Sequence, residues 1–279
     1  INVEIIVIKT KGDKMLEARF SEINDKGLFT KEIETALASR EIDIAVHSMK
    51  DLPVELPEGL MLGAIPEREI PNDALVSKFK LGELPSGAKI GTGSIRRMAQ
   101  ILNFRKDIMV KDIRGNIDTR LRKMETLGFD GIIVACAGLK RLNLLSRVSE
   151  IIPFEIMLPA PGQGAIAVEI RKGDKKIHEV VSNLNDNNTF KSVTAERSLL
   201  TKISQAHAAN NLMDIPQGSG GCQVPMGALA FIKNGRLKLK AMISNLNGAK
   251  IIKGEIEGRS SESKKLGEKL AEKLLSEMI

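Results

Sequence analysis

Apolar runs that suit buried strands alternate with stretches of helical periodicity from the start of the chain to residue 135. The strand-like runs cover 3–8, 41–46, 108–113 and 132–135, and the helical stretches cover 27–40, 95–102 and 116–127. Alternation of this kind is typical of helices packed over parallel strands, so it predicts α/β layers. With 279 residues, the chain is long enough for two or three domains.

The order of elements changes after Thr189. A helical stretch around 193–203 is followed by three strand-like runs at 224–232, 237–244 and 250–257, and then by a final helix at 261–277. Leu266, Leu270 and Leu274 recur every four residues along that helix. This part of the chain predicts a separate small α+β domain with a three-stranded antiparallel sheet.

The formal net charge of +7 calls for an acidic partner. The chain has no Trp, no Tyr and only eight Phe, so it lacks the stacking surfaces on which single-stranded nucleic acid is bound. Its basic residues stand singly or in pairs where a strand leads into a helix. We therefore expect a small polyanion as the ligand, and no nucleic acid.

Cys222 follows two glycines and precedes a strand-like run, so its sulfur is expected to be accessible. It could be a nucleophile, a metal ligand, half of a disulfide or the anchor of a covalent group. Its only possible partner within the chain, Cys136, lies in an apolar run at 130–137 that reads as a buried strand. We therefore expect no disulfide, and the histidines have no zinc-site spacing, so we expect no metal.

No apolar run of about 18 residues is present, and the first residues lack the pattern of a secretion signal. We expect no membrane association, and a cytosolic location.

Two junctions between a strand and a helix look suited to binding an anion. In the first, Gly91-Thr92-Gly93-Ser94 precedes a helix whose first turn carries Arg96 and Arg97. Backbone N–H groups at a helix start and paired guanidinium groups both suit carboxylates or phosphates. The second junction, Asp112 to Asn116, contains Arg114 and is followed by Arg120. One such junction is most often a solvated helix start, but two in neighbouring units suggest one shared anionic ligand.

Asp51 follows the strand-like run at 41–46 and precedes Leu52 and Pro53. It reads equally well as a turn aspartate and as an ionised carboxylate that stabilises a developing cation at the mouth of a cleft. The residues alone leave both interpretations open.

Six motifs, in this order, resemble those of the porphobilinogen deaminase family, the hydroxymethylbilane synthases. They are residues 46–53 (VHSMKDLP), 91–97 (GTGSIRR), 114–116 (RGN), 137–142 (AGLKRL), 159–164 (PAPGQG) and 220–225 (GGCQVP). They span nearly the whole chain, and six in order are highly specific where each alone could arise by chance.

The resemblance implies a transferase that joins four porphobilinogen molecules head to tail, releases ammonia at each step and hydrolyses the product to hydroxymethylbilane. It implies a dipyrromethane cofactor attached to Cys222 by a thioether. The family fold implies two lobes like those of type 2 periplasmic binding proteins and a small cofactor-attachment domain. We expect domain 1 at 1–66 and 165–185, domain 2 at 67–164, domain 3 at 186–279, and a monomer.

Family correspondence also assigns roles to individual residues. Asp51 is implied as the catalytic carboxylate. Besides Cys222, the residues implied around the cofactor are Ser48, Lys50, Thr92, Ser94, Arg96, Arg97, Arg114 and Gly115. Those implied for the substrate are Arg120 and Arg141, together with Lys26 and Phe29 in a loop over the cleft.

The chain departs from the family pattern in three places. The usual N-terminal strand and Gly-Thr-Arg-x-Ser motif are absent, so we expect the sequence to be incomplete. Residues 204–219 form an insertion that is expected to be a surface loop, and Glu22 stands where the family has a lysine. Two other functions are weighed: a non-enzymatic two-lobed anion-binding protein, which leaves Cys222 unexplained, and a cysteine hydrolase that would need His207.

Overall fold

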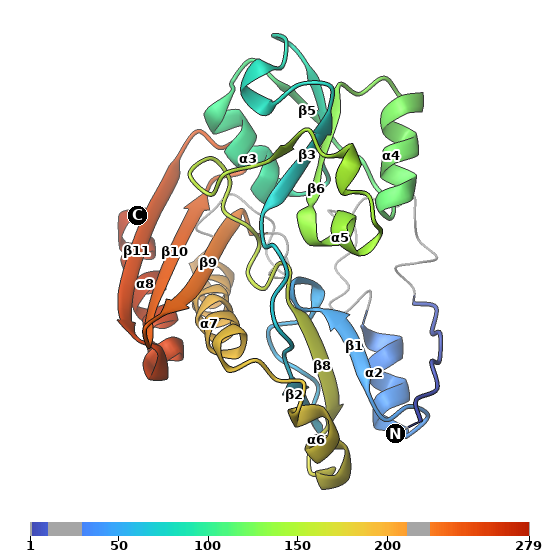
Figure 1. The fold of residues 1–279 in the computed structure, drawn as a ribbon. Helices are drawn as coiled ribbons and strands as arrows, with labels where there is room; N and C mark the ends of the chain where they lie inside the picture. The colour runs from blue at the N-terminus through green and yellow to red at the C-terminus, as the bar shows by residue number, and fades with distance from the viewer. Residues whose placement is uncertain (1, 11–29, 211–223, 279) are drawn as a thin grey trace.

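The computed structural model describes residues 2–10, 30–210 and 224–278. Their strands form three sheets, and Figure 1 shows these sheets as two lobes joined by crossing segments, with a third unit beside them. The crossing segments are residues 65–72, which lead out of the first sheet, and 152–165, which lead back to it.

The first lobe is built on a sheet in which the last strand of the lobe lies in the middle. The order is β1-β8-β2, and β8 is antiparallel to both neighbours. The elements are α2 (Lys31–Ala38), β1 (Ala45–Ser48), β2 (Leu60–Ala64), β8 (Ile166–Arg171) and α6 (Lys175–Ser182). Leu37 of α2 and Val181 of α6 are buried against this sheet, in separate apolar clusters.

The second lobe has a mixed sheet in the order β5-β4-β6-β3-β7. β4 runs parallel to β5 and β6, whereas β3 is antiparallel to β6 and β7. Its strands are β3 (Asp73–Ser77), β4 (Lys89–Gly91), β5 (Met109–Lys111), β6 (Gly131–Ala135) and β7 (Glu150–Ile151), and its helices are α3 (Ile95–Phe104), α4 (Ile117–Thr126) and α5 (Cys136–Arg141). Ile101 of α3 packs on one face of the sheet, and Leu121 of α4 and Leu139 of α5 pack on the other.

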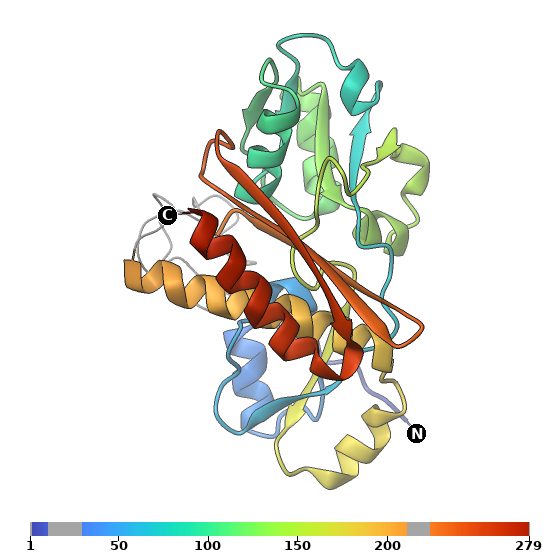
Figure 2. The same cartoon turned by 90° about the vertical axis from the view of Figure 1, so that its left-hand side faces the viewer.

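The C-terminal unit is an antiparallel sheet, β9-β10-β11, with two helices across one face (Figure 2). Its elements are α7 (Asn187–Asn210), β9 (Met226–Lys233), β10 (Arg236–Ser244), β11 (Ile251–Arg259) and α8 (Ser263–Met278). Leu199 of α7 and Leu270 of α8 lie in its core. The opposite face packs on the returning segment, where Leu158 contacts Leu229 and Met242 in one cluster.

One buried carboxylate joins all three parts. Glu196 of α7 is fully buried and accepts two hydrogen bonds from Arg68, at 2.6 and 3.1 Å. It also accepts from the backbone N–H groups of Gly162 at 2.6 Å and Ala230 at 2.7 Å. Arg68 lies on the outgoing segment, Gly162 on the returning one and Ala230 on β9. Both crossing segments are therefore anchored to the C-terminal unit at a single point.

A second buried carboxylate organises the sheet of the second lobe. Asp73, at the start of β3, is fully buried and lies 2.7 Å from both Arg96 and Arg97 of α3. Gln163 of the returning segment donates to it at 2.9 Å. Burial alone would raise the pKa of Asp73, but the two guanidinium groups outweigh that effect and hold it well below its usual range.

The structure confirms the α/β layers and the antiparallel C-terminal sheet, but it corrects several local predictions. The first lobe has antiparallel rather than parallel pairs because β8 returns between β1 and β2 from far along the chain. The predicted strand at 3–8 is wrong. Val3, Ile5 and Val7 are 79, 85 and 83% exposed, and no described strand pairs with this segment. Without a neighbour, its backbone lacks the hydrogen bonds of a sheet.

Two further predictions change in detail. Cys136 is buried as predicted, but it begins helix α5 instead of lying in the strand. The predicted surface loop at 204–219 is helical as far as Asn210, since α7 continues through an alanine-rich stretch that favours helix. Residues 211–219 lie outside the described part of the chain, as do Glu22 and the first three residues of the predicted helix at 27–40.

Replacing Glu196 should destabilise the whole molecule. Glu196→Ala leaves the buried guanidinium of Arg68 and two backbone N–H groups without their acceptor, so we expect a loss of about 3–5 kcal/mol in unfolding free energy, measured in urea. Glu272→Ala is the control, because its ion pair with Lys202 at 3.4 Å is exposed. The control should lose less than about 1 kcal/mol. Similar small losses in both variants would contradict the anchoring role.

The contribution of Asp73 to the stability of the fold should depend on pH. A carboxyl whose pKa is lowered on folding stabilises the fold above its unfolded pKa, about 3.9, and loses that effect as the pH falls through the folded value. Asp73→Asn should therefore lower the melting temperature by a constant amount between about pH 8 and pH 5, and by less below about pH 4. Asp118→Asn, at an exposed position of α4, should show neither effect. A pH-independent gap for Asp73→Asn would refute this account.

Candidate functional site

The turn after β1 presents Asp51 to solvent. Met49 is fully buried, and its N–H donates to the carbonyl of Ala165 at 3.1 Å, which ties the start of a short 3₁₀ turn, Met49–Asp51, to the returning segment. Gly162 lies directly beneath, with φ of +75°, and a Cβ there would come within 2.5 Å of Met49 Cγ. Lys50 is half-buried and Asp51 is exposed, as is Ser48 at the end of β1.

The junction between β4 and α3 forms the first of the two predicted anion sites. Thr92 is buried, and its Oγ1 accepts from the N–H of Ser94 at 3.2 Å. Ser94 caps α3 by accepting from the N–H of Arg97. Arg96 and Arg97 are only 4 and 5% exposed, unlike the solvated arginines of an ordinary helix start. Arg97 uses all three of its nitrogens, on Asp73 and on the carbonyl of Ile133.

The junction between β5 and α4 forms the second predicted anion site. Asn116 caps α4 through its side chain, which accepts from the N–H of Thr119 at 2.9 Å. Gly115 has φ of +112°, a conformation that disfavours other residues, and its carbonyl accepts from Arg120 Nε at 2.7 Å. Arg114 Nε donates to Asp112 at 2.7 Å. The backbone thus holds Arg120, and a neighbouring carboxylate holds Arg114.

These junctions and the Asp51 turn interact electrostatically. The pKa of Lys50 is lowered by burial and by the nearby charges of Arg97 and Arg96, against the opposing effects of Asp51 and Asp73. Burial, with further lowering by Arg97 and Arg114, brings the pKa of Arg120 to about 10, even though Asp112 and Asp51 act to raise it. The packing agrees with this: a Cβ on Gly93 of the first junction would lie 2.9 Å from Asp112 of the second, and one on Gly162 would lie 3.4 Å from the backbone nitrogen of Lys50.

We call this group of side chains the cationic cluster. It comprises five cations, Lys50, Arg96, Arg97, Arg114 and Arg120, and three carboxylates, Asp51, Asp73 and Asp112. Among these eight described groups, positive charges outnumber negative ones by five to three. Cations gathered in a partly buried place favour a ligand of opposite sign. The cluster therefore fits a ligand that carries several carboxylates.

Other predicted residues lie elsewhere or outside the described residues. Arg141 is exposed at the end of α5 and donates to the carbonyl of Gly164 at 3.1 Å, so it joins the returning segment. Lys26, Phe29 and Cys222 fall in the ranges that the structure does not describe. His207 is buried near the C-terminal end of α7.

Sequence reasoning missed Asp73 and Glu196. Asp73 opens an apolar run, Ala74-Leu75-Val76, and an acid at such a position is a signal of a buried, paired carboxylate. Glu196 had no comparable signal, because its partners come from segments far away in the sequence.

Within residues 2–10, 30–210 and 224–278, no group of three or more metal-ligating side chains is placed to hold a metal ion. None of the helices in this part of the chain is long and apolar enough to span a membrane.

Comparison with known proteins gives consistent results along the chain. Residues 1–179 match the family described as "Porphobilinogen deaminase, dipyromethane cofactor binding domain", and residues 219–276 match "Porphobilinogen deaminase, C-terminal domain". The porphobilinogen deaminase of Carboxydothermus hydrogenoformans is 48% identical over 99% of this chain and 85% of its own length. That of Desulforamulus reducens is 46% identical over the same shares.

A similar solved structure is a TRAP periplasmic solute-binding protein from Rhodobacter sphaeroides, at 10% identity. The match covers 55% of this chain and 60% of that one, with a TM-score of 0.35. The matches in sequence cover both lobes and the C-terminal unit, and they disfavour the non-enzymatic alternative. The chain belongs to the porphobilinogen deaminase family, and thus to the transferases of tetrapyrrole biosynthesis that work on a dipyrromethane cofactor.

Proposed function

We propose that Asp51 is the catalytic carboxylate with which this chain couples porphobilinogen units head to tail. One observation carries the proposal: of the three carboxylates in the cationic cluster, Asp51 is the one left for a ligand. Asp73 is held by Arg96 and Arg97, and Asp112 is held by Arg114. Asp51 is exposed, and it acts electrostatically on Lys50 and Arg120.

The chemistry of the substrate explains why one carboxylate is needed. When porphobilinogen loses ammonia, its C–N bond breaks and leaves a cationic methylene carbon conjugated with the pyrrole ring. Asp51 stabilises that cation through its charge and accepts a hydrogen bond from the pyrrole N–H. A C–C bond then forms to the next ring, and the proton displaced from that ring leaves with the help of the same carboxylate.

The cationic cluster supplies the binding energy for the acidic side chains. Each pyrrole ring carries an acetate and a propionate, so the growing product gains two negative charges with every unit. We assign Lys50, Ser48, Thr92, Ser94, Arg96, Arg97, Arg114 and Gly115 to the dipyrromethane cofactor. When bound, the cofactor supplies the pyrrole carbon to which the first substrate is joined. We assign Arg120 and Arg141, with Lys26 and Phe29, to the substrate.

The coupling of Lys50 and Arg120 to Asp51 supports their place at the reacting end of the ligand. The pairing of Arg96 and Arg97 with one carboxylate still leaves one positive charge for the cofactor. Arg141 is supported by its motif and its exposed position, and Lys26, Phe29 and Cys222 by their motifs alone. We infer further, from the family resemblance, that the protein acts as a monomer in the cytosol.

Asp51→Asn should keep the fold and the cofactor but lose turnover. The amide is nearly the same size as the carboxylate but carries no charge and accepts no proton, so kcat should fall by at least about 100-fold. Glu58→Gln, at an exposed position in the connection between β1 and β2, is the matched control and should keep its activity. Normal consumption of porphobilinogen by Asp51→Asn would remove Asp51 from the mechanism.

Covalent attachment at Cys222 should be visible in the intact protein mass. The wild-type protein should carry an adduct that is absent in Cys222→Ser, and the serine variant should be inactive. Cys136→Ala is the control because Cys136 is the only other cysteine and is buried, so it should keep the adduct. An unmodified Cys222 thiol in active wild-type protein would overturn the assignment.

A further inference from the structure

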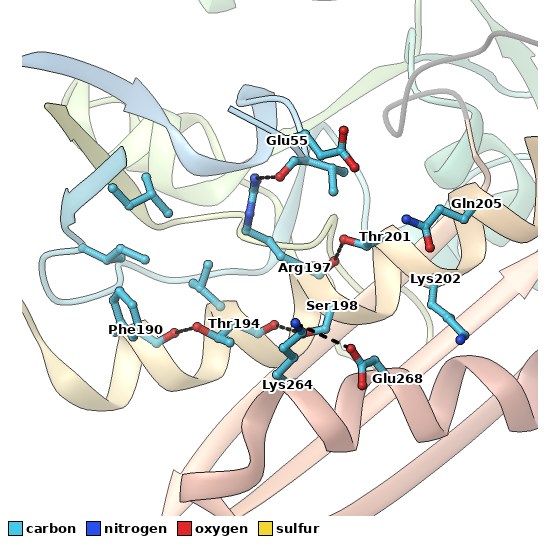
Figure 3. A pocket seen from close by; sticks show the side chains of 14 residues that line it. Glu55, Phe190, Thr194, Arg197, Ser198, Thr201, Lys202, Gln205, Lys264 and Glu268 are labelled. Carbon is cyan, nitrogen blue, oxygen red and sulfur yellow. Dashed lines mark hydrogen bonds and ion pairs between the residues drawn. The ribbon is translucent and has the colours of Figure 1, made fainter. Parts of the chain in front are cut away.

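The guanidinium of Arg197, on α7, donates hydrogen bonds to the backbone that follows Asp51. Its Nη1 donates to the carbonyl of Leu52 at 3.2 Å, and its Nη2 donates to the carbonyls of Pro53 at 2.5 Å and Val54 at 3.0 Å. Figure 3 shows the side chain reaching from the helix to this segment. One guanidinium thus binds three successive carbonyls. Because the group is planar and rigid, it fixes both the lengths and the directions of these hydrogen bonds.

The segment from Met49 to Val54 has little regular secondary structure of its own to hold it in place. The 3₁₀ turn that carries Asp51 is only three residues long, Met49–Asp51, and Leu52–Val54 belong to no helix or strand. Upstream, Met49 anchors the turn by its burial and by its N–H bond to Ala165. Downstream, Leu52 is buried, and Arg197 supplies the side-chain hydrogen bonds. Asp51 therefore lies between two anchors, one in the first lobe and one on α7.

Arg197 is itself held rigidly. The preceding residue, Glu196, is fixed by Arg68 and by two backbone N–H groups, and the flanking Ala195 and Leu199 are buried in the core of the C-terminal unit. The guanidinium therefore extends from a well-anchored helix, and a shift of α7 would be transmitted to the backbone next to Asp51.

A groove beside Arg197 makes its hydrogen bonds to residues 52–54 accessible to small molecules. It has a volume of about 430 Å³ and is lined by the 54–65 segment, by one face of α7 and by α8. On α7 that face includes Phe190, Thr194, Arg197 and Thr201, which follow helical spacing, and α8 adds Lys264 and Glu268 (Figure 3). A small cation could therefore occupy the place of the guanidinium if the arginine side chain were removed.

From this geometry we propose that Arg197 is a positioning residue for Asp51: it holds the carbonyls of Leu52–Val54 so that the carboxylate stays in place for the reaction. The inference rests on the proposed catalytic role of Asp51. Loss of the hydrogen bonds from Arg197 should lower kcat more than it changes KM, because the cationic cluster that binds substrate stays intact. A displacement of about 1 Å at a reacting group costs on the order of 100-fold in rate.

The test compares variants of the cofactor-loaded protein. Arg197→Ala should lower kcat about 10- to 100-fold with little change in KM, and ethylguanidinium should restore much of the loss, whereas ethylammonium should not. Arg197→Lys, which keeps the charge but not the fork, should stay impaired. It also serves as the readout if the alanine variant does not fold. Lys202→Ala is the matched control, because Lys202 lies on the same helix and lines the same groove but pairs with Glu272.

The outcomes separate this inference from the proposed function. A wild-type kcat in folded, cofactor-loaded Arg197→Ala would overturn the inference, as would a loss that Lys202→Ala shares or that ethylguanidinium leaves unchanged. Asp51→Asn is measured in parallel: normal turnover there would defeat the catalytic assignment itself. An inactive Asp51→Asn beside a fully active Arg197→Ala would leave the proposed function intact and defeat only the role of Arg197.

Discussion

The arrangement of the three parts depends on one buried charge, the carboxylate of Glu196. A buried carboxylate is tolerated only where hydrogen-bond donors replace the water it has lost, and Glu196 takes these donors from three different stretches of chain. The requirement to satisfy it therefore brings the outgoing segment, the returning segment and β9 to one point. Apolar contacts around Leu158 then add area to this junction, but they lack the directionality that places the backbones.

Asp73 follows the same logic within the second lobe, with a consequence for binding. Its single negative charge orients two guanidinium groups, so it fixes their geometry without neutralising both of them. An anion-binding site needs cations that are held in position before the ligand arrives, because ordering long side chains costs affinity. A buried carboxylate shared by two guanidinium groups meets both demands, because it fixes their geometry and leaves one positive charge open to a ligand.

The sequence predicted the class of fold and most helices and strands because their signals are local. The cap residues Ser94 and Asn116 and the apolar stripes of α3, α4 and α8 lie within a few residues of the elements they define. The antiparallel placement of β8 and the partners of Glu196 and Asp73 were not predictable in this way, since they join residues distant along the chain. The segment at 3–8 shows the converse error, because a local preference for strand gains nothing where no described neighbour pairs with it.

The site residues show the same division. Arg96, Arg97, Arg114 and Arg120 were predicted from the two strand-to-helix junctions, and the electrostatic coupling brings them together with Asp51. What the junctions did not indicate is how each cation is held. Arg97 is held by a buried acid, Arg114 by a neighbouring acid and Arg120 by a backbone carbonyl. Since a carbonyl carries no net charge, the hydrogen bond that holds Arg120 does not offset its charge, and Asp112 and Asp51 act on it without a hydrogen bond, whereas Arg114 donates directly to Asp112. A lengthening chain of carboxylates should therefore meet cations that are held in different ways, by a shared buried acid, by a neighbouring acid or by a backbone carbonyl, instead of a uniformly positive surface.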